Sequence, residues 1–215
     1  GSSSVLSGGG ASTYNWAGGP STATWTVTPS SYTVYTITGT DGNGCTNTAT
    51  TDVDVYSLPN ITTSGPLPFC EGGSGTISAS ATPSIISSAF TWEPGTLSGA
   101  SQSVSPTTST TYTVSATDGN GCSNTSTVTV TVNSNPSVSI TANPIVPTVC
   151  IQYQQVTLSG NGATSYSWSG SISNATAFTA TSGTTTYTVT GTDANGCTNT
   201  DQVVVTVNAL PTVGA

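Results

Sequence analysis

The 215-residue chain contains no Lys, Arg, His or Met, and its net charge of -8 comes entirely from carboxylates. Nucleic-acid binding needs cations that displace counterions from phosphates, and attraction to an anionic membrane surface needs them as well. Without His or Lys the chain cannot build a Ser-His, Cys-His or Ser-Lys nucleophile pair. These absences predict a protein that is not an enzyme, has no catalytic residues and binds no nucleic acid.

Long apolar runs and helical periodicity are missing too, so the sequence predicts no membrane insertion. Only 4% of the residues are charged, whereas 46 Thr and 34 Ser supply most of the polar side chains. Apolar residues make up 33% of the chain and follow an ordered pattern, which argues against disorder. We therefore expect a folded protein with a hydroxyl-rich surface.

One unit recurs three times along the chain. The segment Thr40-Asp41-Gly42-Asn43-Gly44-Cys45 returns around Cys122 and again around Cys197. Trp16, Trp92 and Trp168 share the same spacing, as do Tyr35, Tyr112 and Tyr187. Shared spacing of three landmarks indicates a tandem repeat. We expect units at residues 1–57, 58–133 and 134–208, followed by a short tail at 209–215.

Within each unit, large apolar residues alternate with small polar residues with a period of two, as in Thr127–Val132 and Val203–Val207. Such β-branched alternation predicts strands with one buried face. The Asp-Gly-Asn-Gly and Asp-Ala-Asn-Gly tetrads predict hairpin turns between strands. The expected fold is all-β: three tandem Ig-like antiparallel sandwiches with Greek-key connections, whose cores contain the three Trp and three Tyr landmarks.

Five cysteines leave one over after pairing. The order of the cysteines within units two and three predicts disulfides Cys70–Cys122 and Cys150–Cys197, each closing a loop of roughly 50 residues worth about 4 kcal/mol. Disulfides imply an oxidising compartment, so we expect a secreted, extracellular or cell-surface protein. Cys45 has no upstream partner in its own unit and is expected to face a missing or intersubunit cysteine.

The first unit lacks a first strand, whereas the tail carries a spare one. Leu210, Pro211, Thr212 and Val213 match the openings of units two and three. Two explanations stay open: a segment cut from a longer array, or donation of the spare strand to the next subunit, which would build a head-to-tail homopolymer.

The Asp-x-Asn-Gly-Cys hairpin, preceded by Thr-Tyr-Thr-Val and followed by alternating Thr and Val, resembles a known repeat. The segments Thr111–Val132 and Thr186–Val207 are similar to the Ig-like or PKD-like repeats of very large secreted surface proteins of Bacteroidota-type bacteria, including gliding adhesins. Unit one departs slightly, with Val34-Tyr35-Thr36-Ile37. The resemblance implies an extracellular spacer, adhesin or fibre.

Other candidate sites have structural alternatives. Asp41, Asp118 and Asp193 are weak Ca²⁺ candidates, because each hairpin offers a single carboxylate and an Asx turn is the better explanation for it. Asn60, Asn124 and Asn174 begin glycosylation sequons, so glycans are the one attached group considered; no metal or other cofactor is expected. Trp25 lies outside the repeat and could contact an interface or a sugar.

These features predict the structural subunit of an extracellular filament or giant surface adhesin, whose main partner is a second copy of itself. The alternative is a carbohydrate-binding extracellular module that recognises surface glycans, or a fragment of a longer adhesin array.

Overall fold

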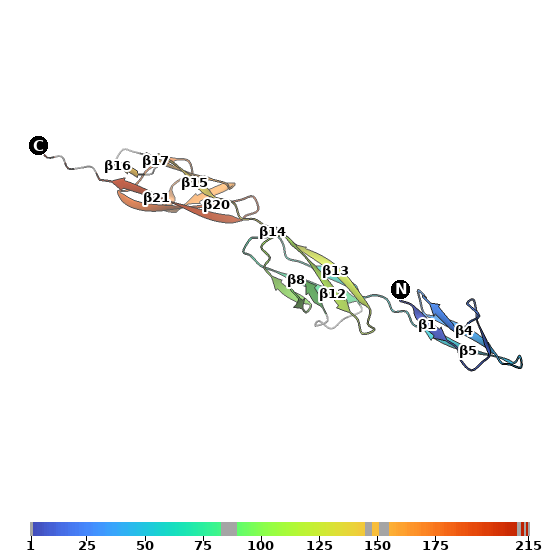
Figure 1. Cartoon of the computed structure of the whole chain (residues 1–215). Helices are drawn as coiled ribbons and strands as arrows, with labels where there is room; N and C mark the ends of the chain where they lie inside the picture. The colour runs from blue at the N-terminus through green and yellow to red at the C-terminus, as the bar shows by residue number, and fades with distance from the viewer. Residues whose placement is uncertain are drawn as a thin grey trace. The chain divides into compact units, whose positions relative to one another are not determined.

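The computed structural model describes residues 2–82, 90–144, 148–150, 155–209, 212 and 214. The described residues form β-strands, connected by turns, and a single 3₁₀ turn, η2 (Ser169–Ser171), with no α-helix among them. The chain divides into two compact units, residues 1–60 with 117–124 and residues 61–116 with 125–215. The strands follow the threefold repeat, as Figure 1 shows, and this confirms the expected all-β antiparallel fold.

Module 1 contains five strands in two antiparallel sheets. One sheet pairs β1 with β3, and the other has the order β2-β4-β5. Its strands are β1 (Ser4–Ser7), β2 (Thr13–Trp16), β3 (Thr24–Val27), β4 (Thr33–Thr40) and β5 (Thr46–Val53).

Module 2 has the same two sheets with further strands added to them. Its sheets have the orders β11-β8-β6 and β10-β9-β12-β13, and β7 pairs in parallel with β14. The strands are β6 (Asn60–Ser64), β7 (Phe69–Cys70), β8 (Gly75–Thr82), β9 (Thr91–Glu93), β10 (Leu97–Ser98), β11 (Ser101–Val104), β12 (Thr110–Thr117), β13 (Ser123–Val130) and β14 (Val132–Asn133).

Module 3 repeats this arrangement. The sheet orders are β15-β17-β19 and β16-β21-β20-β18, with β16 parallel to β21. The strands are β15 (Ser139–Asn143), β16 (Thr148–Cys150), β17 (Gln155–Asn161), β18 (Ser165–Trp168), β19 (Ala177–Thr179), β20 (Gly183–Thr192) and β21 (Thr198–Asn208).

Modules 2 and 3 therefore open with two short strands that module 1 does not have among its described residues. The first, β6 or β15, adds to the edge of one sheet. The second pairs in parallel with the final strand of its module, β7 with β14 in a separate two-stranded sheet and β16 with β21. We call β6 and β15 the A strands and β7 and β16 the A′ strands. Module 1 begins directly with β1, the counterpart of β8 and β17.

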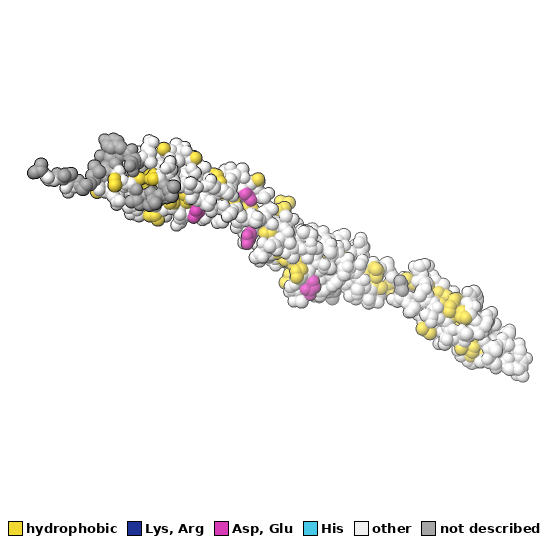
Figure 2. Space-filling view, turned by 45° about the horizontal axis from the view of Figure 1, so that its top comes forward, with side chains coloured by type: hydrophobic (Ala, Val, Ile, Leu, Met, Phe, Trp, Pro, Cys, Tyr) yellow, Lys and Arg dark blue, Asp and Glu magenta, His cyan; other side chains and the backbone are white. Residues whose placement is uncertain are grey.

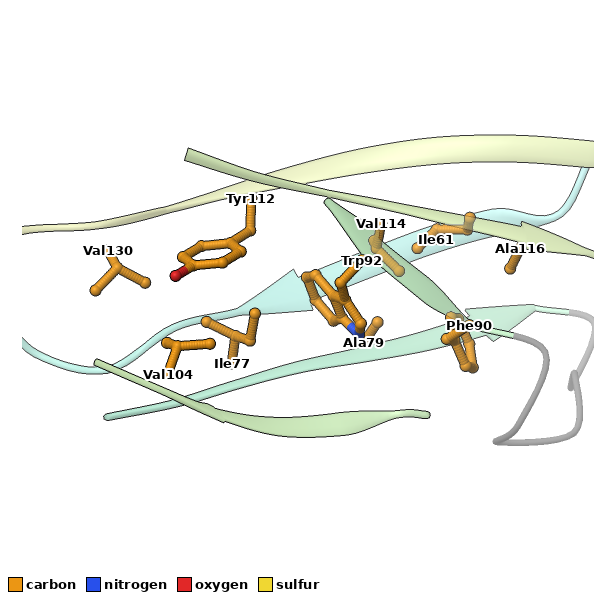
Figure 3. Packing of buried hydrophobic residues seen from close by; sticks show 10 residues of the cluster. All are labelled: Ile61, Ile77, Ala79, Phe90, Trp92, Val104, Tyr112, Val114, Ala116 and Val130. Carbon is orange, nitrogen blue, oxygen red and sulfur yellow. The ribbon is translucent and has the colours of Figure 1, made fainter. Parts of the chain in front are cut away.

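Each module has its own apolar core, made by side chains that alternate inward along the strands. In module 2 the fully buried Trp92 lies among Ile77, Val114 and Tyr112, as Figure 3 shows. The indole N–H of Trp92 donates to the carbonyl of Gly99 at 2.9 Å. The aromatic ring thus fills the space between the two sheets while its polar atom keeps a hydrogen bond.

The landmark aromatics occupy similar places in the three modules. Trp16 and Trp92 are buried, and Trp168 is half-buried against the core of module 3. Tyr112 and Tyr187 are buried, whereas Tyr35 is half-buried beside the core of module 1.

The surface is dominated by uncharged polar side chains. On the face drawn in Figure 2, acidic side chains are isolated and the visible surface is mostly neither hydrophobic nor charged. Thr side chains on the outer strand faces produce this surface, because they suit a strand as well as Val does. Among the described residues, no helix is both long enough and apolar enough to span a bilayer.

Candidate functional site

The three repeated hairpins have one geometry, set by their aspartates. In module 3, the Asp193 carboxylate accepts backbone N–H groups of Asn195 and Cys197, both at 2.8 Å. Asp118 in module 2 and Asp41 in module 1 accept the equivalent groups at 2.8–2.9 Å. The three Ca²⁺ candidates are thus in Asx turns, and the described residues bring no three metal-ligating side chains together. Each turn fixes the backbone of the cysteine that follows it.

The hydrogen bonds to Asp41 lower the pKa of its carboxyl group. The backbone N–H of Cys45 is the largest cause, followed by that of Asn43. Both donors favour the ionised form, because an N–H group bonds the carboxylate better than the protonated acid.

This shift predicts that acid loosens the first hairpin. The folded pKa lies below the ordinary value of about 3.9, so the stabilising contribution is complete above that value and is lost as the pH falls through the folded pKa. We expect the amide NMR signals of Asn43 and Cys45 to titrate with a midpoint below the ordinary value. In Asp41→Asn, which keeps an acceptor oxygen without the charge, these signals should stay flat. A wild-type midpoint at or above the ordinary value would contradict the prediction.

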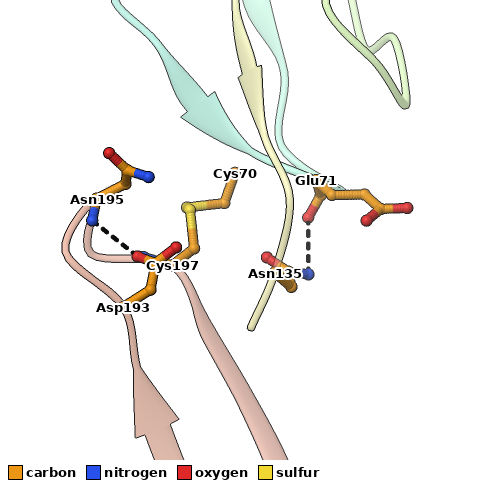
Figure 4. The surroundings of a disulfide bond; sticks show 6 residues. All are labelled: Cys70, Glu71, Asn135, Asp193, Asn195 and Cys197. Carbon is orange, nitrogen blue, oxygen red and sulfur yellow. Dashed lines mark hydrogen bonds between the residues drawn. A yellow bond between two sulfur atoms is a disulfide. The ribbon is translucent and has the colours of Figure 1, made fainter. Parts of the chain in front are cut away.

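The cysteines pair differently from the sequence prediction. Cys70 of module 2 is bonded to Cys197 of module 3, with a Cα–Cα distance of 5.5 Å (Figure 4). Cys122, Cys150 and Cys45 are free thiols. The predicted pairs Cys70–Cys122 and Cys150–Cys197 are therefore wrong, and the disulfide joins consecutive modules instead of closing each one.

The parallel pairing of the A′ strand explains this correction. Cys70 lies opposite Asn133 of β14, whereas Cys122 directly precedes β13, eleven residues earlier in the chain. Strands rise about 3.3 Å per residue, so a module separates its two cysteines by roughly 35 Å, far beyond the reach of a disulfide. Module 3 has the same geometry, because Cys150 lies opposite Asn208. Only a hairpin from another module can reach an A′ cysteine.

A second contact accompanies the disulfide. The side-chain amide of Asn135 donates to the carbonyl of Glu71 at 3.3 Å, as Figure 4 also shows. Asn135 lies four residues before β15, the first strand of module 3, and Glu71 directly follows Cys70. The segment between the modules is thereby fixed next to the bond.

Module 1 has an open groove where the other modules carry their first strands. The groove has a volume of about 450 Å³ and runs between Ser7–Ala11 and Thr46–Thr51, with Trp16, Ile37 and Gly39 at its floor. Its β5 wall is exposed at every residue from Thr46 to Asp52, whereas half of the residues of the equivalent β13 are partly or fully buried. The space beside the core of module 1 is thus open to a further strand.

The other two modules show what fills this space. The buried Pro59 and Pro136 precede the A strands, and their carbonyls accept the side-chain amides of Asn124 at 2.8 Å and Asn199 at 3.0 Å. The equivalent residue in module 1 is Asn47, which lines the groove. The side-chain oxygen of Asn47 accepts the backbone N–H of Thr48, just as the side-chain oxygen of Asn199 accepts the backbone N–H of Thr200. Within the described residues, Asn47 has no proline carbonyl to bond.

A glycine marks the same place. A Cβ on Gly191 in module 3 would meet Val138 of the A segment at 2.6 Å, so Val138 packs directly on the glycine. Gly39 is the equivalent glycine of module 1, and its surroundings include Ala11 and Tyr14 but no counterpart of Val138. In module 1, Gly39 therefore offers the space that an A-segment valine fills in module 3, and no described residue of module 1 fills it.

The other predicted sites lie as follows. Leu210, Pro211 and Val213 of the predicted donor strand are outside the described residues, and Thr212 is exposed. Asn60 is exposed, whereas the Asn124 amide bonds Pro59 and the Asn174 carbonyl accepts Gly160 N–H and the Trp168 indole. Asn60 is thus the sequon with the least internal bonding.

Trp25 packs within module 1. Its ring lies 6.0 Å from that of Trp16 and 5.2 Å from that of Tyr35. Gly19 lies directly against the ring, since a Cβ there would approach it to 2.7 Å. Trp25 is therefore part of the module's aromatic cluster.

Sequence reasoning missed Asn47, Gly39 and the partner of Cys70. The available signal was the recurrence of Asn two residues after each hairpin cysteine and of Gly two residues before each hairpin aspartate in modules 1 and 3. The eleven-residue interval from Cys122 to Asn133 and from Cys197 to Asn208 was a further signal.

No protein-family model and no curated protein matches the chain. Among solved structures, protocadherin gamma B2 extracellular cadherin domains 3–6 are similar at 10% identity and a TM-score of 0.32, covering 91% of this chain and 65% of that one. The protocadherin gammaB4 extracellular domain is similar at 13% identity and a TM-score of 0.33, covering 96% of this chain and 43% of that one. The human desmocollin-1 ectodomain is similar at 15% identity and a TM-score of 0.23, covering 89% of this chain and 51% of that one. The chain thus spans less than two thirds of each of these structures, and its function is inferred below from its own residues.

Proposed function

We propose that the chain is a structural subunit of an extracellular filament or giant surface adhesin, assembled head to tail by strand donation. The observation that carries this proposal is the open groove of module 1, which matches the space that an A segment fills in modules 2 and 3. The occupant is residues 210–214 of a second copy.

The match between groove and occupant is residue by residue. Leu210-Pro211-Thr212-Val213 aligns with Leu58-Pro59-Asn60-Ile61 of module 2, whose proline and isoleucine are both buried. In the proposed complex the Pro211 carbonyl accepts the Asn47 amide, and Val213 lies over Gly39. Backbone pairing with the edge of β1 supplies most of the affinity, as in other cases of strand addition.

The intermodule disulfide and the surface support an external, load-bearing role. A bond between consecutive modules persists in an oxidising environment and limits how far the two modules can extend when the array is pulled. A surface of Thr and Ser stays hydrated without cations. The resemblance to repeats of large secreted bacterial surface proteins agrees with this role.

Assembly of the purified chain tests the proposal. We expect the intact chain to form head-to-tail oligomers in analytical ultracentrifugation and strings in electron micrographs, and a chain truncated after Asn208 to stay monomeric. A peptide of residues 208–215 should bind the truncated chain. An intact chain that remains monomeric, or a truncated chain that still assembles, would contradict strand donation.

The variant Asn47→Ala tests the groove itself. It removes one hydrogen bond worth about 0.5–1.5 kcal/mol, so the peptide should bind about twofold to thirteenfold more weakly. Asn43→Ala is the matched control, because Asn43 is exposed on the adjacent hairpin and outside the groove lining. Equal weakening by both variants would count against the proposed seat.

A further inference from the structure

Two free cysteines of this chain occupy the two positions that form the observed disulfide. In that bond, one sulfur comes from the last residue of an A′ strand and the other from the residue after a hairpin turn. Cys150 is the last residue of the A′ strand β16, and Cys45 follows the hairpin turn of module 1. Both are exposed.

Cys150 matches Cys70 in backbone position. Cys70 lies opposite Asn133 in the parallel pairing of β7 with β14, and Cys150 lies opposite Asn208 in that of β16 with β21. Each of these asparagines follows a valine that pairs with the residue before the cysteine. Module 3 therefore presents Cys150 where module 2 presents Cys70.

Cys45 matches Cys197 equally closely. The Cys45 N–H donates to the Asp41 carboxylate at 2.9 Å, and the Asp41 N–H donates to the Cys45 carbonyl at 3.0 Å. The Cys197 values toward Asp193 are 2.8 and 2.9 Å. The preceding glycines, Gly44 and Gly196, have φ values of 86° and 83°. Cys197 is disulfide-bonded and 1% exposed, whereas Cys45, on the equivalent turn of module 1, is an exposed free thiol.

We propose that Cys150 of one copy forms a disulfide with Cys45 of the next, so that the head-to-tail polymer is covalent. This inference rests on the proposed strand donation, which makes module 1 of the second copy follow module 3 of the first as module 3 follows module 2. The groove that receives the donated strand and the Cys150–Cys45 pair then lie at the same junction, between module 3 of one copy and module 1 of the next. A hairpin cysteine of a further module of the same repeat type would pair with Cys150 by the same chemistry. Mixing two cysteine variants, as described below, tests whether the partner is Cys45 of a second copy.

The bond forms by exchange with a small disulfide oxidant such as oxidised glutathione. The Cys150 thiolate attacks one sulfur of the oxidant, which releases one reduced glutathione and leaves a mixed disulfide. The Cys45 thiolate then attacks Sγ of Cys150 and releases the second glutathione. The two protein thiols give two electrons and two protons in total, and the oxidant accepts them.

Cys122 is left out of this scheme. It is a hairpin cysteine like Cys45, but its partner would be an A′ cysteine of module 1, and the described residues of module 1 include no A′ strand. Polymer subunits should therefore retain one thiol each, at Cys122. That thiol provides an internal control for random oxidation.

The test is oxidation of the purified chain, with Cys70–Cys197 intact, in a glutathione redox buffer. We expect a ladder of covalent multimers on non-reducing gels, and a Cys45–Cys150 linked peptide in mass spectra of a chymotryptic digest. Cys45→Ser and Cys150→Ser should each abolish the ladder, and Cys122→Ser should retain it. A mixture of Cys45→Ser and Cys150→Ser chains should give covalent dimers and nothing longer.

Sedimentation of the Cys45→Ser, Cys150→Ser double variant separates the two proposals, since it reports non-covalent assembly alone. Assembly of this variant together with the wild-type ladder supports both. Assembly without a wild-type ladder overturns the disulfide and leaves strand donation standing. A ladder that needs Cys122, or that survives Cys45→Ser, overturns the disulfide as well. A chain that gives neither assembly nor ladder overturns both proposals.

Discussion

Replacing Trp92 by Ala is expected to unfold module 2 under conditions in which module 1 stays folded. Trp92 is fully buried at the centre of the core in Figure 3, and it donates a hydrogen bond to the Gly99 carbonyl. Truncation of a buried Trp costs about 3–5 kcal/mol through lost burial and the cavity that remains. A small module has only a limited core to offset such a loss.

Hydrogen exchange measured by mass spectrometry resolves this effect by module. We expect fast exchange in peptides from β8, β9 and β12 of the variant, with β2, β4 and β5 of module 1 changed little. Ser103→Ala is the matched control, because Ser103 is exposed on β11 of the same module and should change the exchange rates by little. A loss of less than about 1 kcal/mol in Trp92→Ala would show that the core tolerates the cavity, in contradiction to the expected range.

Much of the fold could be predicted because local sequence specifies it. The alternation in Thr111–Ala116 appears in β12 as alternating burial, with Tyr112, Val114 and Ala116 buried. The Asp-x-Asn-Gly tetrads form the expected turns, since Asn and Gly accept the required backbone conformations. These features depend on neighbours within a few residues, so one sequence is enough to predict them.

The disulfide could not be predicted in the same way, because it depends on the register between distant strands. The order of cysteines along the chain placed Cys70 and Cys122 in one module, but the parallel pairing of β7 with β14 sends Cys70 to the opposite end of that module. Module 3 then supplies Cys197 from a hairpin 127 residues further along the chain. A period in the sequence identifies equivalent residues but does not show which of them meet.

The groove falls between these two cases. The expectations of an absent first strand and of a matching tail came from the repeat alignment, because they concern whole segments. The roles of Asn47 and Gly39 were not apparent, because they follow from how Pro59, Pro136 and Val138 cross the end of each complete module. Those contacts join residues more than 50 positions apart, such as Asn124 and Pro59.

Removing the intermodule disulfide by Cys70→Ser is expected to destabilise modules 2 and 3 together and to leave module 1 unchanged. When module 3 unfolds beside a folded module 2, the bond holds Cys197 in place and turns the unfolded segment into a closed loop of roughly 60 residues. In the chain-entropy model such a loop is worth about 4 kcal/mol, and the same holds for module 2 beside a folded module 3. Each module should therefore lose stability by several kcal/mol when either cysteine is replaced.

Exchange protection in β12 and in β20 should fall in both Cys70→Ser and Cys197→Ser, while that in β4 of module 1 should not. Cys122→Ser is the control, because it replaces a free thiol on an equivalent hairpin and breaks no bond. The double variant Cys70→Ser, Cys197→Ser should be no less stable than either single variant, since the bond is already absent in each. If protection of β20 were the same with and without the bond, the disulfide would not restrain the unfolded modules, and the predicted stabilisation would be wrong.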